Sequence, residues 1–173
     1  MTGAPRAYVG MGSNLGDRAG NLLLGVRGMT AAGLSVSRLS SVYETEPAGV
    51  SEEQPSFLNM AVELRAPLPP PEELLRLLLD IERALGRTRP RTLAPRTLDL
   101  DLLLYEAKTV VTDTLTLPHP RLHQRRFVLA PLAELIPEGR HPTLDSTFAQ
   151  LLAATPERPY VRPWTPYEMM TGE

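Results

Sequence analysis

Residues 57–86 read FLNMAVELRAPLPPPEELLRLLLDIERALG, a strand pattern followed directly by a helix pattern. Over 57–64 the even-numbered apolar residues share one face of an extended chain, while Asn59 and Glu63 share the other. The triple proline at 69–71 favours a helix start, with acidic residues in the first turn. Apolar residues then recur at helical spacing, and Gly86 is typical of a helix end. The recurring residues are Leu74, Leu78, Ile81 and Leu85.

The segments on either side extend this alternation of strands and helices. Apolar alternation or short apolar runs predict strands at 7–12, 35–43 and 98–105, and a hairpin at 109–112 and 115–117. Helices are expected at 21–32, 127–135 and 147–153, and an extended proline-rich tail from about 155. The order favours an α+β fold with an antiparallel sheet covered by helices, the split βαβ arrangement, plus extra C-terminal elements. We expect a single domain over 1–173.

The composition excludes several classes of protein. The 173 residues are 42% hydrophobic and 22% charged, and they contain no Cys, so no disulfide framework and no Cys nucleophile are possible. A net charge of −2 argues against binding nucleic acid by bulk charge. No signal peptide is recognised and no apolar run is long enough to cross a bilayer. These features predict a soluble, cytoplasmic protein that needs neither nucleic acid nor a membrane, and we expect a monomer.

The sequence lacks two common phosphate-binding motifs. Gly10, Gly12 and Gly16 follow a predicted strand, but their spacing is one residue longer than the dinucleotide-binding fingerprint requires. We interpret these glycines as a tight turn between strand and helix. A Walker A loop is excluded because Lys108 is the only Lys and Ala107 precedes it.

The segment at 94–104, APRTLDLDLLL, carries the strongest chemical signal. Asp99 and Asp101 are two residues apart on a predicted strand, so both carboxylates project from the same face. Two like charges on an apolar strand are costly unless a cation neutralises them, and Mg²⁺ prefers one or two carboxylates together with phosphate oxygens. A solvated strand face would give the same pair, and the residues alone leave both interpretations open.

Arginines flank the Asp pair on both sides. All but one of the 18 basic residues are Arg, and two groups stand out. An Arg group beside a magnesium site suits a polyphosphate, although each run alone also fits a solvated surface. Phe57 and Phe127 could stack on a flat organic molecule, or they could be core residues. The amide of Asn59 could bind the edge of a heterocycle. The first Arg group is Arg83, Arg87, Arg89, Arg91 and Arg96, and the second is Arg121, Arg125 and Arg126.

These motifs together resemble 6-hydroxymethyl-7,8-dihydropterin pyrophosphokinase of folate biosynthesis. The resemblance rests on RTLDLDLL at 96–103 and GSNLG at 12–16, and it runs in family order from about Tyr8 to Pro131. Further matches are SVYETEP at 41–47 with Gly49, QPSFLN at 54–59, Ile81-Glu82, Gly86-Arg87, and Pro118-His119 with Arg125 and Phe127.

The resemblance implies a ferredoxin-like fold and a Mg²⁺-dependent transfer of diphosphate from ATP to the pterin hydroxymethyl group, which releases AMP. It implies two Mg²⁺ ions, with Asp99 and Asp101 as ligands, and ATP as co-substrate. The implied catalytic residues are Arg87, Arg96, Asp99 and Asp101. The implied pterin-binding residues are Thr45, Ala48, Phe57, Asn59 and Phe127. We expect ATP binding by Glu82, Arg87, Arg89, Arg96, Leu102, His119 and Arg125.

Two other functions, RNA recognition and small-molecule sensing without catalysis, would require different residues. An RNA-recognition module would place aromatic residues on its central strands, whereas this chain has 5% aromatic residues and two Asp on the relevant strand. An inactive small-molecule sensor on the same scaffold would not need both Asp residues together with the Arg groups. Both alternatives predict no AMP formation from ATP and the pterin alcohol.

Overall fold

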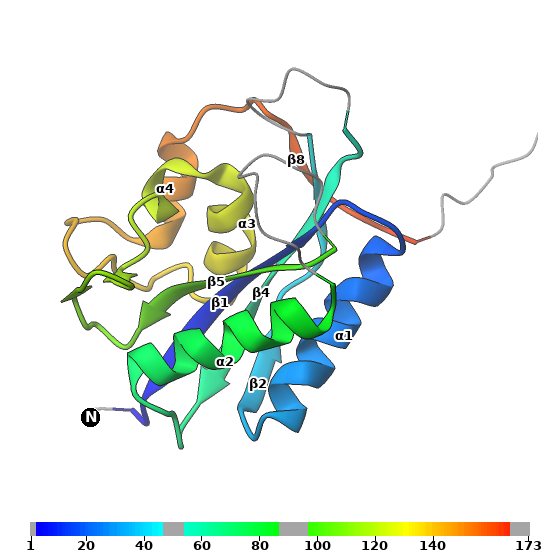
Figure 1. Cartoon of the computed structure of the whole chain (residues 1–173). Helices are drawn as coiled ribbons and strands as arrows, with labels where there is room; N and C mark the ends of the chain where they lie inside the picture. The colour runs from blue at the N-terminus through cyan, green and yellow to red at the C-terminus, as the bar shows by residue number, and fades with distance from the viewer. Residues whose placement is uncertain (1–2, 47–53, 87–96, 167–173) are drawn as a thin grey trace, which may run out of the picture.

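A computed structural model describes residues 3–46, 54–86 and 97–166 of the chain. Its main sheet is antiparallel and six-stranded, in the order β5-β1-β4-β3-β8, with β2 also pairing with β4 (Figure 1). The strands are β1 (Arg6–Ser13), β2 (Ser35–Leu39), β3 (Tyr43–Thr45), β4 (Phe57–Arg65), β5 (Asp99–Tyr105) and β8 (Val161–Pro163). Two short strands, β6 (Val110–Val111) and β7 (Thr116–Leu117), form the predicted hairpin.

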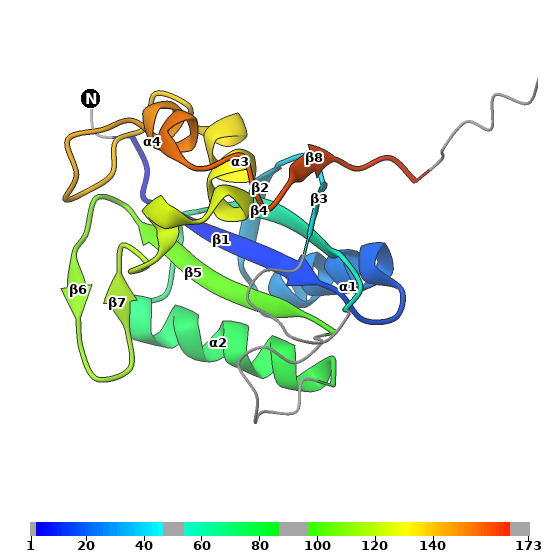
Figure 2. The same ribbon diagram turned by 90° about the horizontal axis from the view of Figure 1, so that it is seen from above.

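Helices cover both faces of this sheet (Figure 2). The helices α1 (Arg18–Ala31) and α2 (Pro71–Ala84) pack on one face, and α3 (Arg126–Leu135) and α4 (Phe148–Ala154) lie on the other. A short 3-10 helix, η1 (Leu122–Gln124), precedes α3. The prediction of an antiparallel sheet covered by helices is therefore confirmed. Among the described helices, none combines the length and the hydropathy needed to span a membrane.

Two apolar cores occupy the two sides of the sheet. The core under α1 and α2 contains the even-numbered residues of β4, from Leu58 to Leu64, together with Leu74 and Leu78 of α2. The core under α3 contains Ala61 of β4 and Leu129 of α3. This division follows from the period of two in a strand, as the alternation over 57–64 predicts.

The helix α2 begins and ends where its sequence indicates. It starts at Pro71, carries Glu72 and Glu73 in its first turn, and buries Leu74 and Leu78 completely. Gly86 follows it with a φ of 88°, a left-handed conformation that costs glycine little.

The helix α1 differs from its prediction at one end. It begins at Arg18 rather than at residue 21, because the side chain of Asp17 accepts a hydrogen bond from the Gly20 N–H and caps the helix there.

Three sequence interpretations need correction. The predicted strand at 35–43 is two strands. Between them the Ser40 N–H still donates to the Ala61 carbonyl of β4, but the Ala61 N–H donates to the Ser40 hydroxyl instead of a backbone carbonyl, which interrupts the ladder. Gly10 and Gly12 lie inside β1 and do not form a turn, whereas Gly16, with a φ of 69°, does. Within the predicted tail, residues 161–163 belong to the main sheet as β8.

Candidate functional site

The Asp pair lies on β5, beside the central strand β1. Asp99 is paired with Gly12 and Asp101 with Gly10. The intervening Leu100 and the neighbouring Leu98 point into the core under α1 and α2. Because side chains alternate along a strand, the two carboxylates project from the opposite face, the one that α3 covers. The sequence prediction that they share a face is therefore consistent with the strand register.

Because glycine has no side chain, Gly10 and Gly12 of β1 leave a gap on this face of the sheet between the side chains of β4 and those of β5. Gly12 is paired with Asp99 on one side and with Asn59 of β4 on the other. A Cβ atom at Gly12 would lie 2.9 Å from Asn59 Oδ1 and 3.6 Å from Phe57 Cδ1. Two glycines at alternate positions of a strand share one face, and the spacing of Gly10 and Gly12 in the sequence could have predicted that both lie in a strand.

Asn59 and Thr45 form a buried polar pair beside the glycines. Asn59 Nδ2 donates to Thr45 Oγ1 at 2.9 Å, and the two residues are 6% and 3% exposed. Thr45 lies opposite Phe57 in the pairing of β3 with β4. The structure thus brings together three of the five predicted pterin-binding residues. Ala48 lies outside the described residues.

The aromatic pair is divided between the sheet and the helical layer. Phe57 is half-buried at the start of β4, on the same sheet face as Asn59. Phe127 is half-buried in the first turn of α3, the helix that covers this face, and it packs against the core there. The guanidinium carbon of Arg125 lies 5.6 Å from the centre of the Phe127 ring.

His119 lies near Asp99, and its surroundings determine the charge and the tautomer of its ring. Burial, together with the charges of Arg125 and Arg121, lowers its pKa to about 4 against the opposing effect of Asp99, so the ring is neutral at pH 7. Its Nδ1 accepts the backbone N–H of Arg121 at 3.2 Å, so the ring proton sits on Nε2 and is available as a donor. The backbone N–H of His119 donates to the Leu103 carbonyl of β5 at 2.9 Å.

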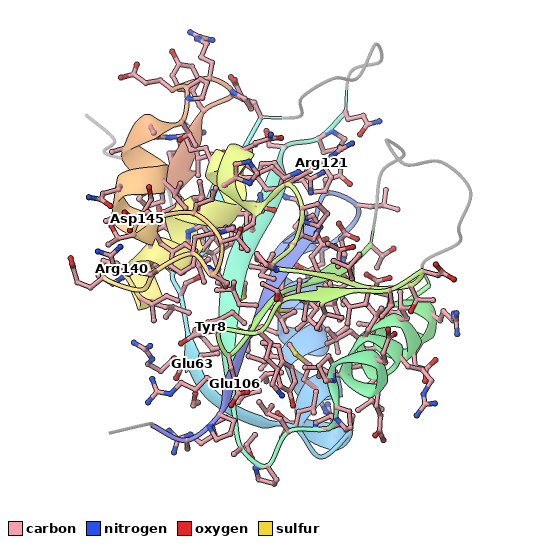
Figure 3. The ribbon with its side chains drawn as sticks, turned by 90° about the vertical axis from the view of Figure 1, so that its left-hand side faces the viewer. Tyr8, Glu63, Glu106, Arg121, Arg140 and Asp145 are labelled. Carbon is pink, nitrogen blue, oxygen red and sulfur yellow. The ribbon has the colours of Figure 1, made fainter. Side chains whose placement is uncertain are left out.

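Arg121 was not among the predicted site residues. Its backbone orients His119 and its charge acts on the same ring. Figure 3 shows Arg121 well apart from Tyr8 and Glu63, which lie toward the other end of β1 and β4. The sequence indicates Arg121 only as a member of the second Arg group.

Glu82 and Leu102 lie on the other side of β5. Glu82 is 2% exposed, and its Oε1 accepts the backbone N–H of Leu100 at 2.7 Å, between the two Asp residues. The Leu102 side chain is buried in the core under α1 and α2. The structure therefore shows Glu82 holding the Asp-bearing strand, while the predicted contacts of both residues with ATP stay predictions. The predicted residues Arg87, Arg89 and Arg96 lie outside the described residues.

The donor set suits a hard cation that also binds substrate oxygens. Within the described residues no group of three or more His, Cys, Asp or Glu side chains is arranged to hold a metal. Mg²⁺ does not need such a group, because it is usually bound by one or two carboxylates plus phosphates and water. Asp99 and Asp101, both partly exposed on one strand face, meet this requirement.

Comparison with known proteins identifies relatives over most of the chain. The family model of 7,8-dihydro-6-hydroxymethylpterin-pyrophosphokinase (HPPK) matches residues 8–137. The 2-amino-4-hydroxy-6-hydroxymethyldihydropteridine pyrophosphokinase of Bacillus subtilis (strain 168) is 49% identical over 130 residues, which are 75% of this chain and 77% of the relative. The enzyme of the same name from Methylorubrum extorquens is 45% identical over 134 residues, which are 77% of this chain and 84% of the relative.

The fold is also found in solved structures. An HPPK-DHPS protein crystallised in complex with substrates is similar with a TM-score of 0.70 and 14% sequence identity, over 88% of this chain and 43% of that longer one. This likeness concerns the fold alone. The family match and the relatives, however, confirm the resemblance predicted from the sequence, and the chain belongs to the 7,8-dihydro-6-hydroxymethylpterin-pyrophosphokinase family.

Proposed function

We propose that this protein transfers the diphosphate of ATP to the hydroxymethyl group of 6-hydroxymethyl-7,8-dihydropterin, releasing AMP, in folate biosynthesis. The family match and the names of its relatives support this reaction. The observation that carries it is the row Asp99–Gly12–Asn59, in which the Asp99 carboxylate and the Asn59 amide share one sheet face with no side chain between them. We further propose that it acts as a cytoplasmic monomer on small molecules.

In this proposal the pterin ring lies between Phe57 and Phe127, with its edge at Asn59 and Thr45. An aromatic sandwich favours a flat ring, and the amide supplies both a donor and an acceptor. Asn59 already donates to Thr45, so its amide orientation is set before substrate arrives. Backbone contacts at Thr45 and Ala48 complete the proposed pocket.

The ATP side is assigned to the Asp-bearing edge of the sheet. Asp99 and Asp101 are the proposed ligands of two Mg²⁺ ions, which when bound would offset the negative charge of the phosphate groups. His119 donates its Nε2 proton to a phosphate oxygen as a neutral ring. Arg125 supplies positive charge, and Arg87, Arg89 and Arg96 are proposed to take up charge as AMP leaves. Glu82 and Leu102 are the proposed nucleoside contacts.

The proposed reaction needs placement and charge neutralisation more than covalent help from the protein. The pterin hydroxyl oxygen attacks the β-phosphorus, the bond between that phosphorus and the bridging oxygen that leaves with AMP breaks, and the hydroxyl proton passes to water. A carboxylate engaged by Mg²⁺ is a weak base, so we assign no strong general base.

One reaction mixture tests the proposed function. The protein is incubated with MgATP and the pterin alcohol, and the products are identified by phosphorus NMR. We expect AMP and a diphosphate ester. Formation of ADP would instead indicate an ordinary kinase, and the absence of any product would contradict the proposal in favour of a binding protein.

The proposal extends to the fold. We infer a ferredoxin-like unit from β1, α1, β2, β4, α2 and β5, supported by the neighbour order β5-β1-β4-β2 and by the two helices on one face. The strands β3 and β8 and the helices α3 and α4 are then additions. All of them belong to one proposed domain.

A further inference from the structure

The C-terminal strand β8 closes the open edge of β3. Val161 is paired with Thr45, and Arg162 is paired with Glu44. The ladder extends beyond the strand at both ends: the Glu46 N–H donates to the Tyr160 carbonyl at 3.2 Å, and the Trp164 N–H donates to the Val42 carbonyl at 2.9 Å. Since β3 has only three residues, the pairing with β8 matters because it gives β3 a hydrogen-bonded strand on both sides.

A carboxylate fastens β8 to the rest of the sheet. Glu44 Oε1 accepts from Arg162 at 2.7 Å, and its Oε2 accepts from Arg18 of α1 at 3.2 Å. Arg18 also donates to the Ser56 carbonyl, directly before β4, at 2.8 Å. The Arg162 guanidinium holds the pKa of Glu44 below its usual range, so the carboxylate is charged at neutral pH. The tail, β3, α1 and the start of β4 are thus joined through the side chains of Glu44, Arg162 and Arg18.

The other end of this connection is the polar pair in the site. Thr45 lies between Val161 of β8 and Phe57 of β4, and its hydroxyl accepts the amide of Asn59. Any movement of β3 therefore moves the acceptor that orients the Asn59 side chain. Binding of a flat heterocycle by an amide depends on that orientation, because misplacement by about 1 Å weakens directional hydrogen bonds and positioning.

We propose that residues 160–164 are a positioning element for the pterin half of the site, acting through β3, Thr45 and Asn59. The family match ends at residue 137, so this segment lies outside the matched region. The inference rests on the proposed function for the identity of the ligand that Asn59 binds. The Asp-bearing edge of the sheet, β5, is separated from β8 by β1, β4 and β3, so the ATP side is not expected to respond.

A charge reversal at Arg162 tests the proposal in the full-length protein. Arg162→Glu sets two carboxylates against each other across β3 and β8. We expect the KM for the pterin to rise about fivefold or more, with kcat and the KM for ATP changed less than about twofold. The matched control is Arg140→Glu, which breaks an exposed ion pair of similar length (2.6 Å to Asp145, Figure 3), and no kinetic change is expected there.

Undocking of the segment can be observed directly. Trp164 is the single Trp of the chain and packs against the core under α1 and α2, so its fluorescence should shift to longer wavelength when β8 leaves β3. A second variant, Trp164→Ala, removes this apolar anchor and should raise the pterin KM in the same selective way. In both variants the side-chain amide resonances of Asn59 should move.

The outcomes separate this inference from the proposed function. AMP formation by the unmodified protein tests the function and does not depend on the variants. Given that activity, a pterin KM that is unchanged in both variants would overturn the positioning role, even with a lower thermal midpoint, because β8 would then only protect a sheet edge. Equal increases in both KM values would overturn it as well, since they indicate general loosening.

Discussion

Asp101 shows how much of the proposed activity depends on one carboxylate. It lies opposite Gly10 and shares the strand face with Asp99, and the two side chains are proposed to act as one ligand set. In Asp101→Ala one of the two proposed magnesium ligands is lost. We expect kcat/KM to fall by roughly 10³-fold, equivalent to about 4 kcal/mol of transition-state stabilisation. AMP formation at saturating Mg²⁺ measures this.

The control for that variant is Asp145→Ala. Asp145 is also an aspartate, but it forms an ion pair with Arg140 and its side chain is 99% exposed, outside the strand β5. Its removal should leave turnover unchanged. Near-normal turnover of Asp101→Ala at saturating Mg²⁺ would rule out the metal assignment.

Gly12 is predicted to matter for its missing side chain. A Cβ atom at this position would lie 2.9 Å from Asn59 Oδ1, so Gly12→Ala must displace the amide that is proposed to read the pterin. We expect the pterin KM to rise about tenfold, with a smaller change in the KM for ATP. Gly3→Ala, where a Cβ atom meets nothing within 4 Å, is the neutral control. Full pterin affinity in Gly12→Ala would show that the amide has room to adapt.

Phe127 is predicted to act as one side of a ring sandwich. It is only half-buried in the first turn of α3, which leaves part of its ring available to a ligand. In Phe127→Ala we expect the dissociation constant of the pterin to rise by at least about tenfold and that of ATP by less than about threefold. Equilibrium binding of each ligand alone measures the two values. Equal losses for both ligands would assign Phe127 to the core.

At the scale of elements, β5 is held from two directions. The strand β1 pairs with it on one side, and Glu82 of α2 accepts the Leu100 N–H on the other. The carboxylate of this helix therefore satisfies a backbone donor that a strand at the sheet edge would leave unpaired. The two proposed magnesium ligands, Asp99 and Asp101, flank Leu100, so this hydrogen bond stabilises the part of β5 that carries them.

Removal of this acceptor should cost stability. In Glu82→Ala a buried N–H loses its partner, and we expect the free energy of unfolding to fall by about 1–3 kcal/mol. Glu82→Gln keeps an acceptor oxygen and should recover most of this loss. Urea unfolding of the two variants measures the difference. Equal destabilisation in both would mean that the charge of Glu82, rather than the hydrogen bond to Leu100, is what stabilises β5.

The elements also show which features the sequence could predict. The helix α2 and the shared face of Asp99 and Asp101 depend on local periodicity, and both were predicted within a few residues. Gly10 was misinterpreted because glycine is typical of turns, and only the strands on either side of β1 show why it lies in a strand. The pairing of β8 with β3 joins residues more than a hundred positions apart, which no local pattern encodes.

At the scale of the whole molecule, two carboxylates, the exposed Glu134 and the buried Glu63, join the α3 layer to the sheet. Glu134 of α3 accepts from the Tyr43 hydroxyl of β3 at 2.6 Å. Glu63 of β4 accepts from Arg38 at 2.6 Å, and Arg38 in turn donates to the Leu135 carbonyl at the end of α3. These contacts hold in place the helix that carries Phe127. Tyr43 is the strand partner of Asn59, whereas Glu63 lies toward the other end of β4.

Glu63 makes this connection sensitive to acid. It is 3% exposed and also accepts from the Tyr8 hydroxyl at 2.8 Å, a pair visible in Figure 3. Burial alone raises its pKa, but the hydrogen bonds that it accepts, first from Arg38, outweigh this and lower the pKa to about 2. The folded state therefore binds a proton less readily than the unfolded chain, in which the value is about 4.3.

The sign of the effect on stability follows from linkage. A carboxyl group whose pKa is lowered by folding contributes its full stabilisation above about pH 4.5, and loses it as the pH falls toward 2. In Glu63→Gln we expect the free energy of unfolding at pH 7 to fall by on the order of 2–3 kcal/mol, and its decrease between pH 4.5 and 2 to become shallower.

Urea unfolding across this pH range is the measurement, with Glu73→Gln as control because Glu73 forms only an exposed pair with Arg76 on α2. Since Glu63 is not near Asp99 or Asn59, the KM values of Glu63→Gln at pH 7 and at low temperature should match those of the unmodified protein. A pH dependence as steep in Glu63→Gln as in the unmodified protein would show that other carboxylates govern acid unfolding. Altered KM values with unchanged stability would instead place Glu63 in communication with the site.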